Sequence, residues 1–329
     1  MKFRTTVELP SEGLALQPQS RLLLLGSCVA EHIGQKMLDG HMRAVVNPMG
    51  VLYNPESIRR CIEVLTNGTY DERYLFEDAS GMWHSWLHSG KFDAVSREEA
   101  LTGIKASLDE GHKRLQEADV LFVTFGTNHV YRHKASDMVV ANCHREPSAT
   151  FAEEVLCAEE IVSSWQSLLT LLPERMKVVF TVSPYRYAKY GMHGSRLSKA
   201  TLLLAVDALC RADKRCLYFP AYEIVLDELR DYRFYAPDML HVSEQGVEYV
   251  WERFKAWAFT EEMTTFAQEW AELSKALAHR PLHPDSEAYR RFEAATKERL
   301  RQFEERWEWR KKGPKDSKDL KDAKDAKNR

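Results

Sequence analysis

Short apolar runs alternate along the chain with longer stretches in which apolar residues recur every three or four positions. The runs at 22–25, 120–125 and 177–182 each end at a glycine or a polar segment, as buried strands of a parallel sheet do. The stretch at 28–38 shows the helical spacing, because Val29, Ile33 and Met37 would share one face. The repeated order of strand, loop and helix predicts an α/β fold with a parallel sheet covered by helices on both faces.

The same pattern predicts further elements between residues 40 and 258. Two more short strands are expected at 43–46 and 216–219, and helices are expected at 56–66, 97–117, 151–172, 198–212 and 243–258. The aromatic segment 74–92 is harder to assign. It is interpreted as an insertion over the ligand cleft expected at the carboxyl edge of the sheet. The loop at 184–196 is expected to be long and mobile.

The character of the chain changes beyond Thr260. Helical patterns continue to about residue 309, with a proline-containing break at 280–284, and a Lys/Asp-rich repeat follows from residue 311. We therefore predict three parts, listed here in chain order: a catalytic domain at 1–258, a helical extension at 259–310 and a disordered tail at 311–329.

Composition narrows the function classes. The net charge is only −3, and no arginine-rich face is interleaved with aromatic residues, so nucleic acid is not an expected partner. The six cysteines include no C-x-x-C pair, which disfavours a zinc ribbon or a disulfide framework. No apolar run approaches the ~18 to 20 residues of a membrane span, and the amino terminus lacks a signal-peptide pattern. We expect a soluble, cytoplasmic protein with reduced thiols and no membrane partner.

Ser27 is the candidate nucleophile, because it follows the first strand and precedes the first helix. Ligand crevices of α/β sheets lie at that edge, and free N–H groups at a helix N-terminus can meet an oxyanion. A serine hydroxyl needs a general base, and the base needs a group that orients it. Asp238 and His241, three residues apart in a polar segment, can supply both.

Acyl chemistry also needs hydrogen-bond donors aimed at the developing oxyanion. The backbone N–H groups of Ser27 and Gly50 and the side-chain amide of Asn128 are the candidates, and all three residues lie at predicted strand ends. Arg186 and Lys199 are candidate substrate-binding residues, since their cationic groups can grip an anionic group.

Two alternative chemistries were weighed against the serine. Cys28 is intrinsically the better nucleophile, but a side chain one residue into the helix is expected to pack toward the core. The pairs His84/His88 and His129/His133 have helical metal-ligand spacing, yet neither comes with an acidic or cysteine partner in the sequence. We expect no metal and no cofactor.

Several segments in order along the chain resemble the GSCFA domain, whose relatives are the SGNH-type hydrolases and the polysaccharide-directed esterases. The matching stretches run from Gly26-Ser27-Cys28-Val29-Ala30 through Asn47-Pro-x-Gly50-x-Leu-Tyr53-Asn54-Pro55, Phe125-Gly126-Thr127, Val182-Ser183-Pro184-x-Arg186, Ser198-Lys199-Ala200 and Tyr218-Phe219-Pro220 to Asp238-x-x-His241. The resemblance spans about residues 20 to 258, so the segment after Thr260 is expected to lie outside it. Val29 replaces the phenylalanine of the signature, and the loop 187–196 matches poorly.

This resemblance implies a flavodoxin-like parallel sheet of the SGNH-hydrolase type and a catalytic triad. Ser27 would be the nucleophile, Gly50 and Asn128 would form the oxyanion hole, and Asp238 with His241 would complete the triad. The expected function is a metal-independent serine ester hydrolase or O-acyltransferase acting on acyl groups of a carbohydrate, with a small-molecule or glycan ester as substrate. The alternative is a non-catalytic glycan-binding or scaffold protein that holds a glycan on the aromatic stretch around Trp83 and Trp86.

Overall fold

The computed structural model describes residues 4–283 and 285–307. The predicted disordered tail at 311–329 lies outside these residues. The chain divides after Phe259 into two units, the first made of Met1–Ala15 and Ser20–Phe259 and the second of Leu16–Gln19 and Thr260–Arg329.

The first unit is built on a five-stranded parallel sheet, as the pattern of apolar runs predicts. In spatial order its strands are β10 (Cys216–Tyr218), β9 (Lys177–Val182), β5 (Val120–Phe125), β1 (Arg21–Gly26) and β2 (Arg43–Val46). Read from β2 to β10 and numbered by their order in the sequence, the strands are arranged 2-1-3-4-5. This is a doubly wound arrangement, with the change of winding direction between β1 and β5, and ligands of such sheets bind outside the carboxyl ends of the strands at that point.

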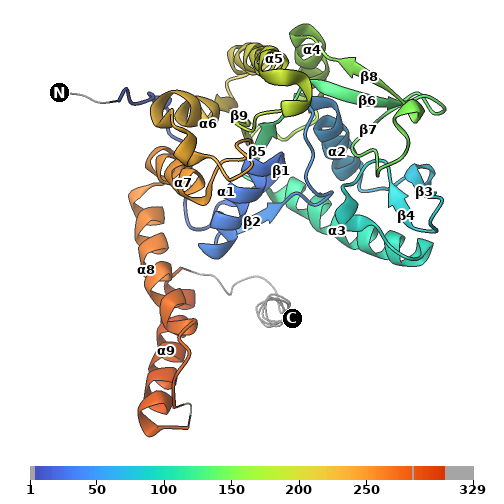
Figure 1. The fold of residues 1–329 in the computed structure, drawn as a ribbon. Coiled ribbons are helices and arrows are strands. Elements are labelled where there is room, and N and C mark those ends of the chain that lie inside the picture. Colours follow the sequence, from blue (N-terminus) through green and yellow to red (C-terminus); the bar gives the residue numbers. More distant parts are fainter. Residues whose placement is uncertain (1–3, 284, 308–329) are drawn as a thin grey trace. The chain divides into compact units, whose positions relative to one another are not determined.

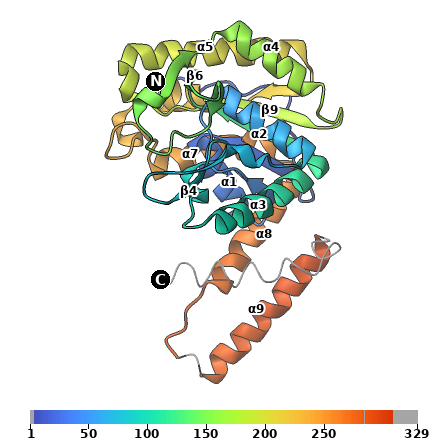
Figure 2. The same cartoon turned by 90° about the vertical axis from the view of Figure 1, so that its right-hand side faces the viewer.

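Helices cover both faces of the sheet, because every central strand is apolar on both sides (Figure 1). One face packs against α2 (Pro55–Asn67), α3 (Arg97–Glu117), α4 (Ala158–Leu169) and α5 (Gly191–Ala212), and the other against α1 (Cys28–Asp39) and α7 (Glu244–Ala258). Leu23 and Leu25 point into the first layer. Phe122 points into the second, where its ring lies 5.8 Å from that of Phe254. Figure 2 shows α4 and α5 side by side.

Two small antiparallel sheets are inserted between the elements of the main sheet. One is the hairpin of β3 (Leu75–Glu77) and β4 (Trp83–Ser85), and the other has the order β7 (Met138–Val140), β6 (His129–His133), β8 (Phe151–Val155). Single-turn or short helices connect the larger elements: η1 (Glu72–Tyr74), η2 (Gly90–Phe92), η3 (Ser148–Thr150), η4 (Ala188–Tyr190), α6 (Ala221–Glu223), η5 (Ile224–Leu229) and η6 (Tyr232–Phe234).

Two predicted helix starts are wrong. The helix expected over 151–172 begins only at Ala158, because Phe151–Val155 alternates buried and less buried positions and pairs with β6 as a strand. The helix expected from Ser198 instead begins at Gly191, so part of the predicted mobile loop is the first two turns of α5.

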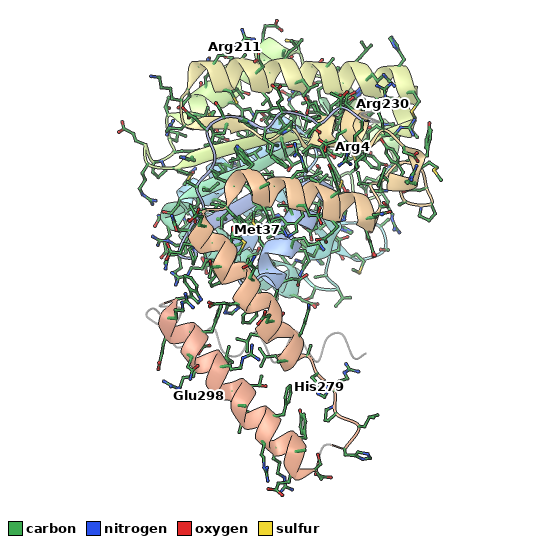
Figure 3. All side chains as sticks on the ribbon, turned by 90° about the vertical axis from the view of Figure 1, so that its left-hand side faces the viewer. Arg4, Met37, Arg211, Arg230, His279 and Glu298 are labelled. Carbon is green, nitrogen blue, oxygen red and sulfur yellow. The ribbon has the colours of Figure 1, made fainter. Side chains whose placement is uncertain are left out.

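The second unit is a helical hairpin of α8 (Glu261–Leu277) and α9 (Glu287–Arg306). The Phe266 and Phe303 rings lie 5.0 Å apart, while His279, at the far end of α8, lies against Phe292 near the start of α9. These contacts make the two helices antiparallel, and Figure 3 labels His279 just after α8 and Glu298 on α9. Within the described residues, the structure contains no helix with the length and apolar character needed to cross a lipid bilayer.

Candidate functional site

Ser27 lies at the carboxyl end of β1, in the turn that leads into α1. Gly26 makes this turn possible for two reasons. Its φ is +131°, a value that other residues rarely adopt, and a Cβ at this position would lie only 2.2 Å from the Thr124 carbonyl oxygen. Ser27 is the N-cap residue of α1, but its side chain forms no capping hydrogen bond. It is 1% exposed, and its Oγ has no hydrogen-bond partner in the described part of the chain. A buried hydroxyl without a partner is uncommon in proteins and is typical of strained or catalytic positions.

The ends of β1, β2 and β5 meet around Ser27. The Tyr53 carbonyl, from the loop after β2, accepts hydrogen bonds from the N–H groups of Gly126 (2.8 Å) and Thr127 (3.0 Å), which follow β5. A Cβ on Gly126 would lie only 3.3 Å from the Ser27 Cβ. The loops that follow these three strands therefore meet at the carboxyl edge of the sheet.

Asn47 fixes the turn that carries Ser27, a role that we did not predict. Its Oδ1 accepts a hydrogen bond from the Gly26 N–H (2.9 Å), and its Nδ2 donates to Glu31 Oε2 (2.7 Å) on α1. The signals in the sequence were its place in the turn-forming segment Asn47-Pro-Met-Gly50 and the family resemblance of that segment. Asn47 ties the ends of β1 and β2 to the first turn of α1.

Gly50 has a structural explanation that differs from the predicted oxyanion role. Its N–H already donates to the Asn47 carbonyl (2.7 Å), and its φ is +78°. A Cβ at Gly50 would lie 1.8 Å from Ser89 Oγ, so both the turn and the close approach of Ser89 require glycine. The Ser27 N–H is also occupied, since it donates to the Thr124 carbonyl (3.2 Å). We do not carry these two N–H groups forward as oxyanion donors.

Asn128 keeps one donor for a ligand. Its Nδ2 donates to the Leu156 carbonyl (2.8 Å), and its backbone N–H donates to Ser198 Oγ (3.1 Å). The side chain is buried, and its Oδ1 has no hydrogen-bond partner among the residues that the structure describes. Because an amide nitrogen carries two hydrogens, the bond to Leu156 uses only one of them.

Asp238 and His241 form a hydrogen-bonded pair between η6 and α7. The distance from His241 Nδ1 to Asp238 Oδ2 is 2.5 Å, and the backbone N–H groups of Leu240 and His241 donate to Asp238 Oδ1 at 2.9 and 3.0 Å. The His241 side-chain bond, followed by these backbone bonds, lowers the pKa of Asp238 to about 2. Both side chains are close to half exposed. The carboxylate holds the imidazole as the orienting member of a triad does.

His241 forms no hydrogen bond with Ser27 Oγ in the described part of the chain. The His241 ring centroid lies 4.4 Å from that of Tyr185, whose backbone N–H donates to Ser183 Oγ (3.3 Å). Ser183 Oγ in turn lies 3.7 Å from Cys28 Sγ. The structure therefore joins Asp238 to His241 and connects this pair to the start of α1 through Tyr185 and Ser183. It forms no hydrogen bond between His241 and the described atoms of Ser27.

Lys199 lies inside the protein instead of on the surface. It is 2% exposed, and its Nζ donates a hydrogen bond to the Gly126 carbonyl and lies 5.1 Å from the Tyr187 ring centroid. Burial lowers its pKa to about 7, with Cys28 acting weakly in the opposite direction. Lys199 is therefore a buried amine near the Ser27 turn, and a substrate anion in solvent cannot reach it in this conformation.

Arg186 holds the loop that carries the Asp238 and His241 pair. Its backbone N–H donates to the Leu240 carbonyl (3.2 Å), and its Nη1 donates to the Met239 carbonyl (3.2 Å). Its guanidinium lies 5.4 Å from the ring centroids of Tyr232 and Tyr235. These contacts give Arg186 a positioning role, and they occupy the guanidinium that we predicted to bind substrate.

Tyr187, a residue that we did not predict, places a buried hydroxyl next to Gly126. Its hydroxyl has no hydrogen-bond partner within the described chain, and a Cβ on Gly126 would lie 2.9 Å from it. Burial raises the pKa of this phenol well above its ordinary value. Gly126 thus separates two unpaired hydroxyl-bearing side chains, those of Ser27 and Tyr187.

Cys28 has the surroundings of a packing residue. Burial raises the pKa of its thiol, which the hydrogen bond with Ser183 and the charge of Lys199 only partly offset. The residue lines a small, mostly apolar cavity together with Val29 and Pro184. These observations support the expected packing role over a thiolate nucleophile.

The two histidine pairs do not assemble as the helical spacing would require. His88 Nδ1 is paired with Ser85 Oγ (2.7 Å), and His129 and His133 lie on strand β6, not on a helix. The aromatic segment also differs from a glycan platform, because Trp86 is 7% exposed and stacks on the Phe76 ring with 3.7 Å between centroids.

Comparisons with known proteins place the chain in a family. A search of curated proteins found no match. The model of the GSCFA domain protein, C-terminal domain, matches residues 270–311, so the expectation that the segment after Thr260 lies outside the family pattern is wrong. The model of the GSCFA family matches residues 21–254, from the start of β1 into α7. The chain therefore belongs to the GSCFA family.

Proposed function

We propose that this protein is a serine-dependent ester hydrolase or O-acyltransferase with Ser27 as the nucleophile. The observation that carries the proposal is the Ser27 hydroxyl itself, which is buried, without a hydrogen-bond partner among the described residues, and adjacent to the start of α1. A hydroxyl held for structural reasons would cap the helix or bond a neighbouring carbonyl. The hydroxyl of Ser27 is instead kept free for another partner.

The proposed base is His241, oriented by Asp238. When a substrate binds, His241 Nε2 takes the Ser27 proton as Oγ bonds to the acyl carbon, because Nδ1 is held by the Asp238 carboxylate. The tetrahedral intermediate then breaks its bond to the alcohol oxygen, which leaves with the proton from His241. Water or a sugar hydroxyl next loses its proton to His241 and attacks the acyl-enzyme. Ser27 recovers its proton as the acid or the new ester departs.

This mechanism requires a movement that brings the base to the nucleophile. Hydrogen bonds of catalytic groups are often long or absent without substrate and form in the enzyme–substrate complex. The Tyr185 to Tyr187 segment lies beside both groups, since Tyr185 contacts His241 and Tyr187 borders Gly126. We infer that a shift of this segment exposes Ser27 and lets His241 approach.

Asn128 and the start of α1 are the proposed oxyanion donors. Asn128 has one side-chain N–H to offer, and the Ser27 side chain leaves the first N–H groups of α1 uncapped. Removing one donor from an oxyanion hole costs about a hundredfold to a thousandfold in rate. An Asn128→Ala variant therefore tests this assignment.

The proposed substrate is an O-acylated carbohydrate, and the proposed fold relationship is to the SGNH-type hydrolases. The strand order 2-1-3-4-5, with the serine directly after the first strand, supports the fold relationship. Tyr53 and Tyr232, which are 45% and 62% exposed, support the substrate class, because exposed aromatic faces pack well against the apolar faces of sugar rings.

The test is hydrolysis of short-chain p-nitrophenyl esters and of an O-acetylated glycan by the full chain. We expect Ser27→Ala to abolish turnover, while the wild type and a matched control, Ser57→Ala, keep it. Ser57 is another buried serine, located on α2. Turnover that survives in Ser27→Ala, or that never appears in the wild type, would contradict the proposal.

A further inference from the structure

Two buried histidines and one partly buried aspartate from separate segments converge within the inserted part of the first unit. His84 lies on β4, Asp93 follows η2, and His144 follows β7. Asp93 Oδ1 is 2.8 Å from His84 Nδ1 and 3.1 Å from His144 Nδ1, and the three atoms lie within 4.8 Å of one another. The two imidazoles are 7% and 1% exposed, and apart from their contacts with each other these three atoms have no hydrogen-bond partner in the described ranges.

In each imidazole, the hydrogen-bond partner of Nε2 shows which ring nitrogen carries the hydrogen. His144 Nε2 lies 2.9 Å from the Ser85 carbonyl oxygen, which can only accept, so Nε2 carries the hydrogen. His84 Nε2 lies 3.1 Å from Asp78 Oδ2, and the same reasoning applies to it. In the neutral rings, each Nδ1 is then a lone pair that faces a carboxylate oxygen. Three electron-rich atoms around one point need a positive charge between them.

We propose that His84 Nδ1, His144 Nδ1 and Asp93 Oδ1 bind one divalent transition-metal ion, with Zn²⁺ as the best-fitting candidate. One divalent cation satisfies all three atoms together. Protonation of both rings would instead place two imidazolium groups side by side with 4.8 Å between their centroids. Protonation of His84 alone would leave the Nδ1 lone pair of His144 facing the Asp93 carboxylate. Two imidazoles and one carboxylate are ligands that Zn²⁺ commonly takes in proteins.

The geometry and the outer contacts both suit such an ion. Zinc bonds of about 2.0 to 2.2 Å place tetrahedral neighbours about 3.3 Å apart, so the spacings of 2.8 and 3.1 Å need a small outward adjustment. The two imidazole nitrogens, whose separation is at most 4.8 Å, have to move closer together when the ion binds. Metal-ligating histidines almost always donate their other N–H to a carboxylate or a backbone carbonyl, as His84 does to Asp78 and His144 does to Ser85. Three protein ligands leave one coordination position for water or a further ligand.

The ion would stabilise the inserted module. It would join the β3–β4 hairpin to the segment after η2 and to the segment after β7. Few backbone hydrogen bonds connect these three segments to one another. Trp83 forms an isolated antiparallel bridge with Ala94, and the Ser89 N–H donates to the Met49 carbonyl (3.0 Å) in the loop after β2. The proposed site is therefore a structural metal site that does not depend on the proposed esterase activity.

The experiment is metal titration of the full chain after chelator treatment and dialysis. We expect one equivalent of Zn²⁺ or Co²⁺ per chain by calorimetry, and a melting temperature that rises by about 5 to 10 °C at a hundredfold excess over Kd. His84→Ala, Asp93→Asn and His144→Ala should each lose the stoichiometric binding. His133→Ala is the matched control and should keep the binding. Its ring packs against Trp86, as the ring of His144 does, but its Nδ1 pairs with Ser136 Oγ and not with Asp93.

A second measurement covers variants that fail to fold. X-ray absorption of the zinc-loaded wild type should show scattering from two imidazole rings and from oxygen. Three results would overturn the proposal: no stoichiometric binding of Zn²⁺ or Co²⁺ by the wild type, binding that survives all three substitutions, or an absorption spectrum without imidazole scattering.

Discussion

Replacing Lys199 by methionine should change how the stability of the protein depends on pH. Methionine has a similar length and no charge, and the site is 2% exposed, so solvent hardly screens the ammonium group. Burial lowers the pKa of Lys199 from 10.5 to about 7. Between these two values the unfolded chain binds a proton that the native protein does not, so the stability of the wild type rises with pH.

The size of this effect follows from the two pKa values. Below pH 7 both states hold the proton, and the native state bears the full cost of the buried charge. Above pH 7 the native amine is neutral, and each further pH unit removes about 1.4 kcal/mol of that cost until the pH reaches the pKa of the unfolded chain. From pH 7 to pH 9, the wild type should gain about 2 kcal/mol of unfolding free energy relative to Lys199→Met.

Urea denaturation followed by circular dichroism at pH 7, 8 and 9 measures this difference. The lost hydrogen bond to Gly126 shifts the stability of Lys199→Met by the same amount at every pH, so the change of the difference with pH carries the information. Lys189→Met is the control, because Lys189 is exposed and pairs with Glu153. A difference between wild type and Lys199→Met that stays constant from pH 7 to pH 9 would refute the reasoning.

Three further predictions address the turn and the Asp–His pair. Gly26→Ala should lower the free energy of unfolding by at least about 3 kcal/mol, measured by urea denaturation, because its Cβ would lie 2.2 Å from the Thr124 carbonyl oxygen at a φ of +131°. Asp238→Asn should lower kcat about 10⁴-fold in ester hydrolysis while leaving the free energy of unfolding nearly unchanged, because its pair with His241 is close to half exposed. Arg186→Met should lower kcat at least tenfold with little change in KM, because it releases the loop of the pair.

The local pattern of the sequence was enough to predict the main sheet and the place of Ser27. Apolar runs that end at polar residues indicate strands, and the order of strands and helices requires a parallel sheet. The pairing of Asp238 with His241 was also within reach, because the two residues are only three positions apart. Interactions over such short distances depend mainly on local backbone geometry.

Features that depend on distant segments were not predictable in the same way. Phe151–Val155 is a strand because β6 is beside it, and the periodicity of 151–172 alone favoured a helix. Lys199 is buried because α5 begins at Gly191 and brings the amine against Gly126. His84 finds Asp93 and His144 as neighbours, whereas its spacing in the sequence pointed to His88.

Covalent labelling of the full chain with a fluorophosphonate, followed by mass spectrometry of its peptides, tests the central claim most directly. The account predicts one adduct, located on Ser27, that is lost in Ser27→Ala and forms far more slowly in His241→Ala. The control Ser57→Ala should label like the wild type. An adduct on another residue, labelling that is unchanged in Ser27→Ala, or no labelling of the wild type would contradict the account.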